Sequence, residues 1–179
     1  FPIEGIHTCI NQICEHGRFV QYLAPIASVI VCGESSIAEN QYEVVRQISM
    51  RNQTTRVLIY ATSVESVEFS RMIKLMRGLA HTKDVKAEDL PSDLRYFVEL
   101  LKVLTDCTAG DMNITTVEAK VQSLYNCENI LSIILHPSTI LFVKSRMLWF
   151  FYHAFIDVEM KVKSLVGTHN IWLLLESFE

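Results

Sequence analysis

The chain has 179 residues, of which 50% are hydrophobic, and its mean hydropathy is +0.24. This length supports one substantial core, and the apolar content is high for a free-standing domain, so we expect part of the apolar surface to contact neighbouring domains of the same polypeptide. The formal net charge of −4 comes from 16 basic and 20 acidic residues scattered along the sequence. Without the basic stripe that nucleic-acid binding requires, DNA and RNA are not expected partners.

Residue spacing argues against two further features, a membrane span and a framework of disulfides or zinc sites. The longest apolar stretch, 140–156, is interrupted by four polar side chains, whereas a membrane span needs about 20 mostly apolar residues. We therefore expect no membrane contact by this segment itself. Five cysteines, at positions 9, 14, 32, 107 and 127, form no C-x-x-C pair. This argues against a disulfide framework or a zinc knuckle and predicts reduced, mostly buried thiols.

The two ends of the sequence lack boundary signals. The chain begins at Phe1 without an initiator Met, and residues 171–179 keep a helical pattern with no stop signal. We therefore expect residues 1–179 to be a single helical-repeat domain and a fragment of a much larger chain.

The first 32 residues predict two helices. The first carries one apolar stripe, made of Ile3, Ile6, Ile10 and Ile13. His16 and Gly17 should end it, because glycine accepts the left-handed conformation after a last turn. The second is expected from about residue 18 to residue 32. Pro25 lies inside it and should cause a kink or break near Ala24, since proline lacks a backbone donor and clashes with the preceding turn.

Three segments have the form of a capping box, which marks a helix start: Ser36-x-x-Glu39, Thr62-x-x-Glu65 and Thr115-x-x-Glu118. Residues 80–90 are polar and aperiodic, so we expect an exposed loop there. Pro91 can occupy the first turn of a helix that runs to about Cys107. Its predicted buried stripe is Leu94, Phe97, Val98, Leu101 and Leu104, with Glu99, Lys102 and Asp106 toward solvent.

The C-terminal third predicts shorter helices, at about 114–124 and 127–136. Pro137 should end the latter, and Ser138 is available to cap the next helix. That next helix, from about residue 140, is the most hydrophobic in the chain, so we expect it to be covered on most sides and to form the centre of the C-terminal half.

The overall pattern is all-α. Some nine or ten helices with short connections, and no alternating strand pattern, predict an armadillo/HEAT-like stack of antiparallel helix pairs, an α-solenoid. Each repeat of about 40 to 47 residues then relies on its neighbour to cover its apolar face, so the chain would hold about four units.

No pattern of reactive side chains stands out, so we expect no catalytic, cofactor-binding or metal residues and no enzyme. The six histidines have no i, i+4 spacing, and Cys107 has no motif that supplies a base. His136, His153 and His169 are interpreted as helix-end or interface groups. Trp149 and Trp172 could anchor a partner, although core packing is the preferred interpretation.

A series of residues in the C-terminal part nevertheless resembles a known family. The series is Cys107-Thr108-x-Gly110, Glu118-x-Lys120, Ser123-Leu124, His136, Val143-Lys144, His153, Val158-Glu159-Met160-Lys161 and His169-x-x-Trp172-x-Leu174-x-Glu176-x-Phe178. In order and spacing it resembles the cytoplasmic helical region of inositol trisphosphate receptors, the intracellular calcium-release channels. Weaker matches occur upstream, including Gly5-Ile6-His7. The link from His153 to Val158 is about two residues shorter than in animal receptors, and the loop after Leu79 differs.

The resemblance implies a non-catalytic domain that couples ligand sensing to pore gating. It implies a homotetrameric channel on the cytoplasmic side of the endoplasmic reticulum membrane, with surface for regulatory proteins. The family's basic ligand cleft has no counterpart among these residues, so ligand binding is not transferred. The C-terminal cluster favours this family over the related ryanodine receptors. The alternative is a soluble helical-repeat scaffold for protein–protein interaction, without a channel.

Overall fold

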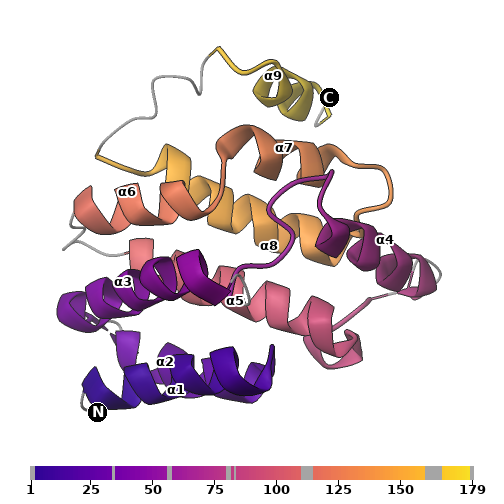
Figure 1. The fold of residues 1–179 in the computed structure, drawn as a ribbon. Helices are drawn as coiled ribbons and strands as arrows, with labels where there is room; N and C mark the ends of the chain where they lie inside the picture. The colour runs from indigo at the N-terminus through magenta and orange to yellow at the C-terminus, as the bar shows by residue number, and fades with distance from the viewer. Residues whose placement is uncertain are drawn as a thin grey trace.

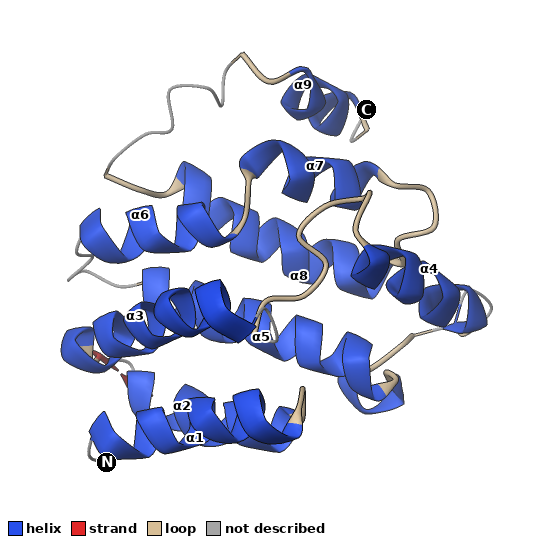
Figure 2. Cartoon of the chain, in the orientation of Figure 1, coloured by secondary structure: helices blue, strands red, loops and turns tan. Residues whose placement is uncertain are grey.

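The structure is a computed structural model that describes residues 3–33, 35–55, 58–79, 82, 84–109, 115–159 and 167–177. Across these ranges the fold is all-α, as predicted (Figures 1 and 2). The α-helices are α1 (Ile3–His16), α2 (Leu23–Ile30), α3 (Ala38–Thr55), α4 (Val67–Leu79), α5 (Ser92–Thr108), α6 (Thr115–Leu124), α7 (Cys127–Leu135), α8 (Leu141–Phe151) and α9 (His169–Glu176). Short elements are the 3₁₀ turns η1 (Val20–Tyr22) and η2 (Ala87–Asp89), the π-helical turn η3 (Tyr152–Ile156), and the antiparallel strands β1 (Val31–Cys32) and β2 (Ser35–Ser36).

The N-terminal helices follow the predicted pattern with one exception. Ile6, Ile10 and Ile13 are buried in α1, and Gly17 has φ +102 directly after its end. The expected break falls between η1 and α2, so that Pro25 lies in the first turn of α2, where a missing N–H removes no helical bond. The prediction of helix up to Cys32 was wrong, because Val31 is extended and begins a hairpin.

Of the three predicted helix starts, the one at Thr115 is confirmed, whereas the one at Thr62 was wrong, since α4 begins at Val67. The Ser36 hydroxyl donates to the carbonyl of Ala109, 3.2 Å away, and α3 begins two residues later. At α4 the cap is Ser66, whose Oγ accepts from the amide of Phe69 at 3.1 Å. At α6 the Glu118 side chain is buried and accepts no hydrogen bond from any described residue. At Ser36 a tertiary partner therefore takes the hydroxyl, and at α4 a nearer serine supplies the cap.

The central element is α5, which packs against α2, α3, α4, α6 and α8 (Figure 1). All five residues predicted for its buried stripe are buried, and so are residues on its other sides, including Tyr96, Leu100 and Cys107. Pro91 is the residue before the helix rather than part of its first turn. On the narrow exposed side Lys102 pairs with Asp106 at 2.6 Å, as expected of groups facing solvent.

The C-terminal helices differ from expectation at α8. Helix α7 is as predicted, with Asn126 capping its start and His136 after its end. However, α8 begins after Ile140, and Ser138 does not cap it. Its buried residues, Val143, Met147, Phe150 and Phe151, form one face only, whereas Leu141 and Trp149 are 81% and 57% exposed. The expectation of a helix covered on most sides was wrong, because α5 and α7 cover a single face of α8.

The remaining predictions concern the exposed loop and the C-terminal end. Of the loop 80–90, residues 80, 81 and 83 lie outside the described ranges, and the others are mostly exposed, with Leu90 buried. Helix α9 packs on α7 (Figure 1). It ends at Glu176, and the amide and hydroxyl of Ser177 bond to carbonyls of its last turn.

Candidate functional site

The described ranges hold no group of three or more histidine, cysteine or acidic residues able to bind a metal ion. His136 is a helix-end group, as predicted, since its Nδ1 accepts from the amide of Ser138 at 3.2 Å. His169 is the first residue of α9. His153 differs, because its Nε2 is buried and has no described hydrogen-bond partner.

The five thiols form no disulfide and differ in exposure. Cys107 and Cys127 are buried, and burial raises the pKa of each, that of Cys127 to about 11. Cys9 and Cys14 are half-buried, and Cys32 is exposed at the β1–β2 hairpin. The prediction of mostly buried thiols therefore fails for Cys32. A raised pKa disfavours the nucleophilic thiolate, so Cys107 and Cys127 are suited to packing.

The connection between α3 and α4 contains an unexpected buried segment, residues 58–61, which we call the strap. Its residues are at most 5% exposed, although the segment is not helical. The buried hydroxyl of Tyr96, in α5, donates to the carbonyl of Leu58 at 3.0 Å. The hydroxyl of Tyr125, between α6 and α7, donates to the carbonyl of Tyr60 at 3.0 Å. These bonds satisfy two buried carbonyls and fasten the strap to two different parts of the fold.

The strap also contacts the N-terminal helices. The guanidinium carbon of Arg18, just after α1, lies 4.6 Å from the centre of the Tyr60 ring, a cation–π geometry. Tyr60 packs on Phe97 of α5 as well, with ring centres 6.2 Å apart. The strap therefore joins the region after α1, the central helix and the α6–α7 junction. In Figure 1 the described part of the α3–α4 connection, which contains the strap, climbs toward α7 and turns back into α4.

A second polar cluster holds α1 to α3. Glu43 of α3 accepts hydrogen bonds from Arg46 Nε and Nη2, each at 2.7 Å, and from Gln47 at 2.9 Å. His7 of α1 contacts the same carboxylate. The Arg46 bonds, aided by those from Gln47 and His7, lower the pKa of Glu43 to about 2 despite its burial. The carboxylate is therefore ionised and fully partnered at neutral pH.

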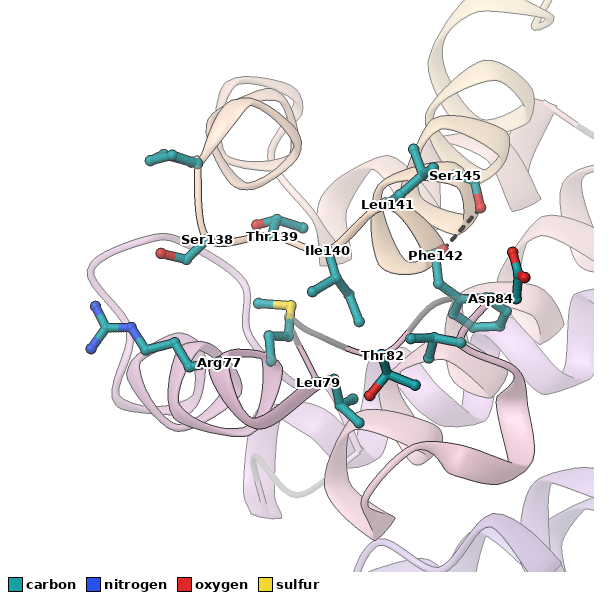
Figure 3. A pocket seen from close by; sticks show the side chains of 13 residues that line it. Arg77, Leu79, Thr82, Asp84, Ser138, Thr139, Ile140, Leu141, Phe142 and Ser145 are labelled. Atoms are coloured by element: carbon teal, nitrogen blue, oxygen red, sulfur yellow. Dashed lines mark hydrogen bonds between the residues drawn. The ribbon is translucent and has the colours of Figure 1, made fainter.

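A groove with a volume of about 910 Å³ lies between the end of α4, the start of α8 and the residues Thr82, Asp84 and Val85 (Figure 3). Leu79, Ile140 and Phe142 form much of its apolar lining. Arg77 and Asp84 lie at opposite ends of it, as Figure 3 shows. The groove is open, and its polar groups do not converge on one point. It therefore suits a polypeptide better than a reacting small molecule.

Exposed apolar side chains gather on α8, η3 and α9. Trp149 is 57% exposed and stacks on Tyr152, with ring centres 6.2 Å apart. Trp172 of α9 is 53% exposed. The preferred sequence interpretation, that both tryptophans pack in the core, was wrong. Exposed aromatic residues of this size are typical of contact surfaces.

The residues that carry the family resemblance do not form one site. Cys107 and Thr108 are buried at the end of α5, whereas Trp172 lies on the outer face of α9. Val158 and Glu159 follow η3 and are not in a described helix. Gly110, Met160, Lys161 and Phe178 lie outside the described ranges. The described residues among them therefore lie on successive elements of the fold.

The fold thus defines an all-α domain with a braced interior. No protein-family model matches the chain. The chain is similar to the inositol 1,4,5-trisphosphate receptor itr-1 of Caenorhabditis elegans, with 22% identity over 170 residues. This similarity covers 95% of the chain but only 6% of that receptor, so the chain spans a small part of the receptor's length. Within the described ranges, no helix combines the length and the apolar character needed to cross a bilayer.

Proposed function

We propose that this chain is a non-catalytic helical domain of an inositol trisphosphate receptor-like calcium-release channel. The single observation that carries the proposal is the similarity to the nematode receptor along 95% of the chain. A similarity that extends over successive helices supports a shared scaffold. In this proposal the helices continue an armadillo-like stack, and the chain belongs to a homotetramer on the cytoplasmic side of the endoplasmic reticulum membrane.

The proposed role is to couple ligand sensing to pore gating. A domain that transmits movement must keep its parts at fixed distances, and the strap supports this role. Arg18, Tyr96 and Tyr125 all contact residues 58–61, although they belong to separate parts of the sequence. A displacement at one of these contacts is therefore passed to the other two.

The exposed aromatic residues are the proposed contacts with neighbouring domains or regulatory proteins. Calcium release from microsomes that contain the full-length protein, measured against inositol trisphosphate concentration, tests the proposal. Replacing Trp149 and Trp172 by Ala should shift this dependence, because the contacts of α8 and α9 are lost. Replacement by Phe keeps most of the contact area and should restore much of the response. An unchanged ligand dependence, in protein whose circular dichroism is unaltered, contradicts the coupling role.

The groove between α4 and α8 favours a second candidate function, a helical scaffold that binds a peptide. Its apolar lining and oppositely charged ends, Arg77 and Asp84, suit a short segment with an acidic residue near one end and a basic residue near the other. The two candidates differ in the complete coding sequence. A channel subunit must contain several runs of about 20 apolar residues, whereas a scaffold needs none.

A further inference from the structure

Helix α8 and the turn η3 that continues it have a second apolar face besides the buried one. This face consists of exposed residues at successive spacings of four, four, three and four positions, and we call it the α8 stripe: Leu141, Ser145, Trp149, Tyr152 and Ile156. Residues at such spacings lie on one side of a helix. The four large side chains are between 42% and 81% exposed, and Trp149 stacks on Tyr152. The stripe is therefore one continuous apolar surface.

The dimensions of the α8 stripe suit a partner helix. At about 1.5 Å per residue, the stripe extends over about 20 Å, which is the length of a helix of about four turns. Ser145 is its one small residue and leaves room between Leu141 and Trp149 for a large side chain of a partner. The Ser145 hydroxyl donates to the carbonyl of Phe142 at 2.9 Å, so that covering it leaves no donor without an acceptor. Recognition of a helix uses apolar anchors at this spacing.

Charged side chains mark the two ends of the stripe with opposite signs. Lys144 and the exposed Arg146 lie near the start of α8. Asp84 lies near the same end in Figure 3, but the basic groups outnumber it there. Asp157, whose side chain is 59% exposed, and the exposed Glu159 follow the stripe at its other end. The surface is thus basic at one end and acidic at the other.

This order of charges does not serve the stability of α8 itself. A helix is stabilised by acidic groups at its start and basic groups at its end, and α8 has neither in its first and last turns. The charges are better placed to orient a partner. A partner helix that runs in the same direction as α8 brings its first turn to Lys144 and Arg146 and its last turn to Asp157. Acidic residues in its first turn and basic residues in its last turn then satisfy both the α8 stripe and its own dipole.

From these observations we propose that the α8 stripe binds an amphipathic protein helix of about four turns, parallel to α8, with an acidic first turn and a basic last turn. The inference rests on the contact role proposed above for the exposed aromatic residues, and it adds the chemistry of the partner. Binding to the 179-residue chain tests it without the channel. A negative result therefore leaves the calcium-release experiment, which tests the coupling role, unaffected.

Tryptophan fluorescence provides the readout. The chain has two tryptophans, Trp149 and Trp172, so that Trp172→Phe leaves Trp149 as the only one. The probe is a synthetic peptide of about 18 residues, cross-linked to hold it helical, with leucines at the spacing of the stripe, glutamates in its first turn and lysines in its last. Its binding should shift the Trp149 emission to shorter wavelength, because the indole loses contact with water. In a Trp149→Phe chain, Trp172 of α9 should show no such shift, because it lies outside the stripe.

A second peptide tests the role of charge. It keeps the leucines but carries lysines in both end turns, and it should bind the chain at least about tenfold more weakly, because Lys144 and Arg146 repel one end of it in either orientation. Lys144→Glu combined with Arg146→Glu should invert this preference, so that the second peptide binds more tightly than the first. Arg71→Glu combined with Lys74→Glu is the matched control at exposed positions of α4, and it should leave the preference unchanged.

Three results overturn the proposal, each in chains whose circular dichroism is unaltered. The first is an unshifted Trp149 emission at saturating concentration of the first peptide. The second is equal affinity of the unmodified chain for the two peptides, which would show that the charges select nothing. The third is a shift of the Trp149 emission with rising chain concentration in the absence of peptide, because a second copy of the chain would then cover the stripe.

Discussion

Helices α5 and α8 have opposite surroundings, although α8 is the more apolar of the two. Helix α5 is buried on most sides between α2, α3, α6 and α8. Helix α8 buries one face, and its largest side chain, Trp149, is 57% exposed. Burial is therefore set by the number of neighbours that a helix has in the fold, and apolar residues without neighbours remain available for contacts elsewhere.

The largest expected effect tests this contrast directly. Phe97→Ala in α5 empties a fully buried position and should lower the free energy of unfolding by about 3 to 5 kcal/mol. Trp149→Ala in α8 removes a larger side chain but should change the free energy of unfolding by less than about 1 kcal/mol. Most of the Trp149 side chain is already exposed to water. Urea denaturation followed by circular dichroism measures both. Equal losses would show that α8 is covered as fully as α5.

The next effect concerns the cluster that joins α1 to α3. Glu43→Gln removes the charge that Arg46 and His7 contact and should cost about 1 to 3 kcal/mol at pH 7. The folded-state pKa of Glu43, about 2, is below its ordinary value of 4.5. Its contribution is therefore complete above about pH 4.5 and is lost as the pH falls from about 4.5 toward 2.

Denaturation at several pH values checks this window. The variant should show a flatter loss of stability below pH 4.5 than the unmodified chain. Glu128→Gln, at an exposed position in α7, is the control and should leave the pH dependence unchanged. If the Glu43→Gln variant lost stability with falling pH as steeply as the unmodified chain, the Glu43 cluster would not be the source of this pH dependence.

A smaller effect is expected at the strap. Tyr125→Phe leaves the buried carbonyl of Tyr60 without its donor and should cost about 1 to 2 kcal/mol. Tyr152→Phe, on the exposed face of η3, should stay within about 0.5 kcal/mol. Thermal unfolding compares the two. A neutral Tyr125→Phe variant would indicate that water replaces the hydroxyl and that the strap is not braced by it.

The smallest effect belongs to α9. Its Asn170 side chain donates to the Ser132 hydroxyl of α7 at 3.0 Å, and Asn170→Ala should cost no more than about 1 kcal/mol. The change should appear as faster amide exchange within α9 alone. Faster exchange in α5 as well would show that α9 supports the central helix.

Sequence periodicity predicted the elements whose apolar residues recur at helical spacing. The stripe of α1, the buried positions of α5 and the limits of α7 all follow from residue spacing. The hairpin at Val31 was missed, because the extended conformation there lies next to a strongly apolar helix.

The buried polar contacts could not be predicted in this way. Tyr96 and Leu58 are 38 residues apart, and Tyr125 and Tyr60 are 65 residues apart. No local pattern pairs a tyrosine hydroxyl with a particular distant carbonyl. The same reason explains the misplaced caps, since the Ser36 hydroxyl finds its acceptor 73 residues away. The exposure of Trp149 and Trp172 was missed because composition does not reveal how many helices surround a position.

The uneven exposure of the thiols has a practical consequence. Cys32 stands at the tip of the β1–β2 hairpin and is exposed, whereas Cys107 and Cys127 are buried with raised pKa values. A maleimide dye should thus attach first at Cys32. A fluorophore placed there, with a second on an engineered cysteine in α6, would report the distance between these two points in single molecules.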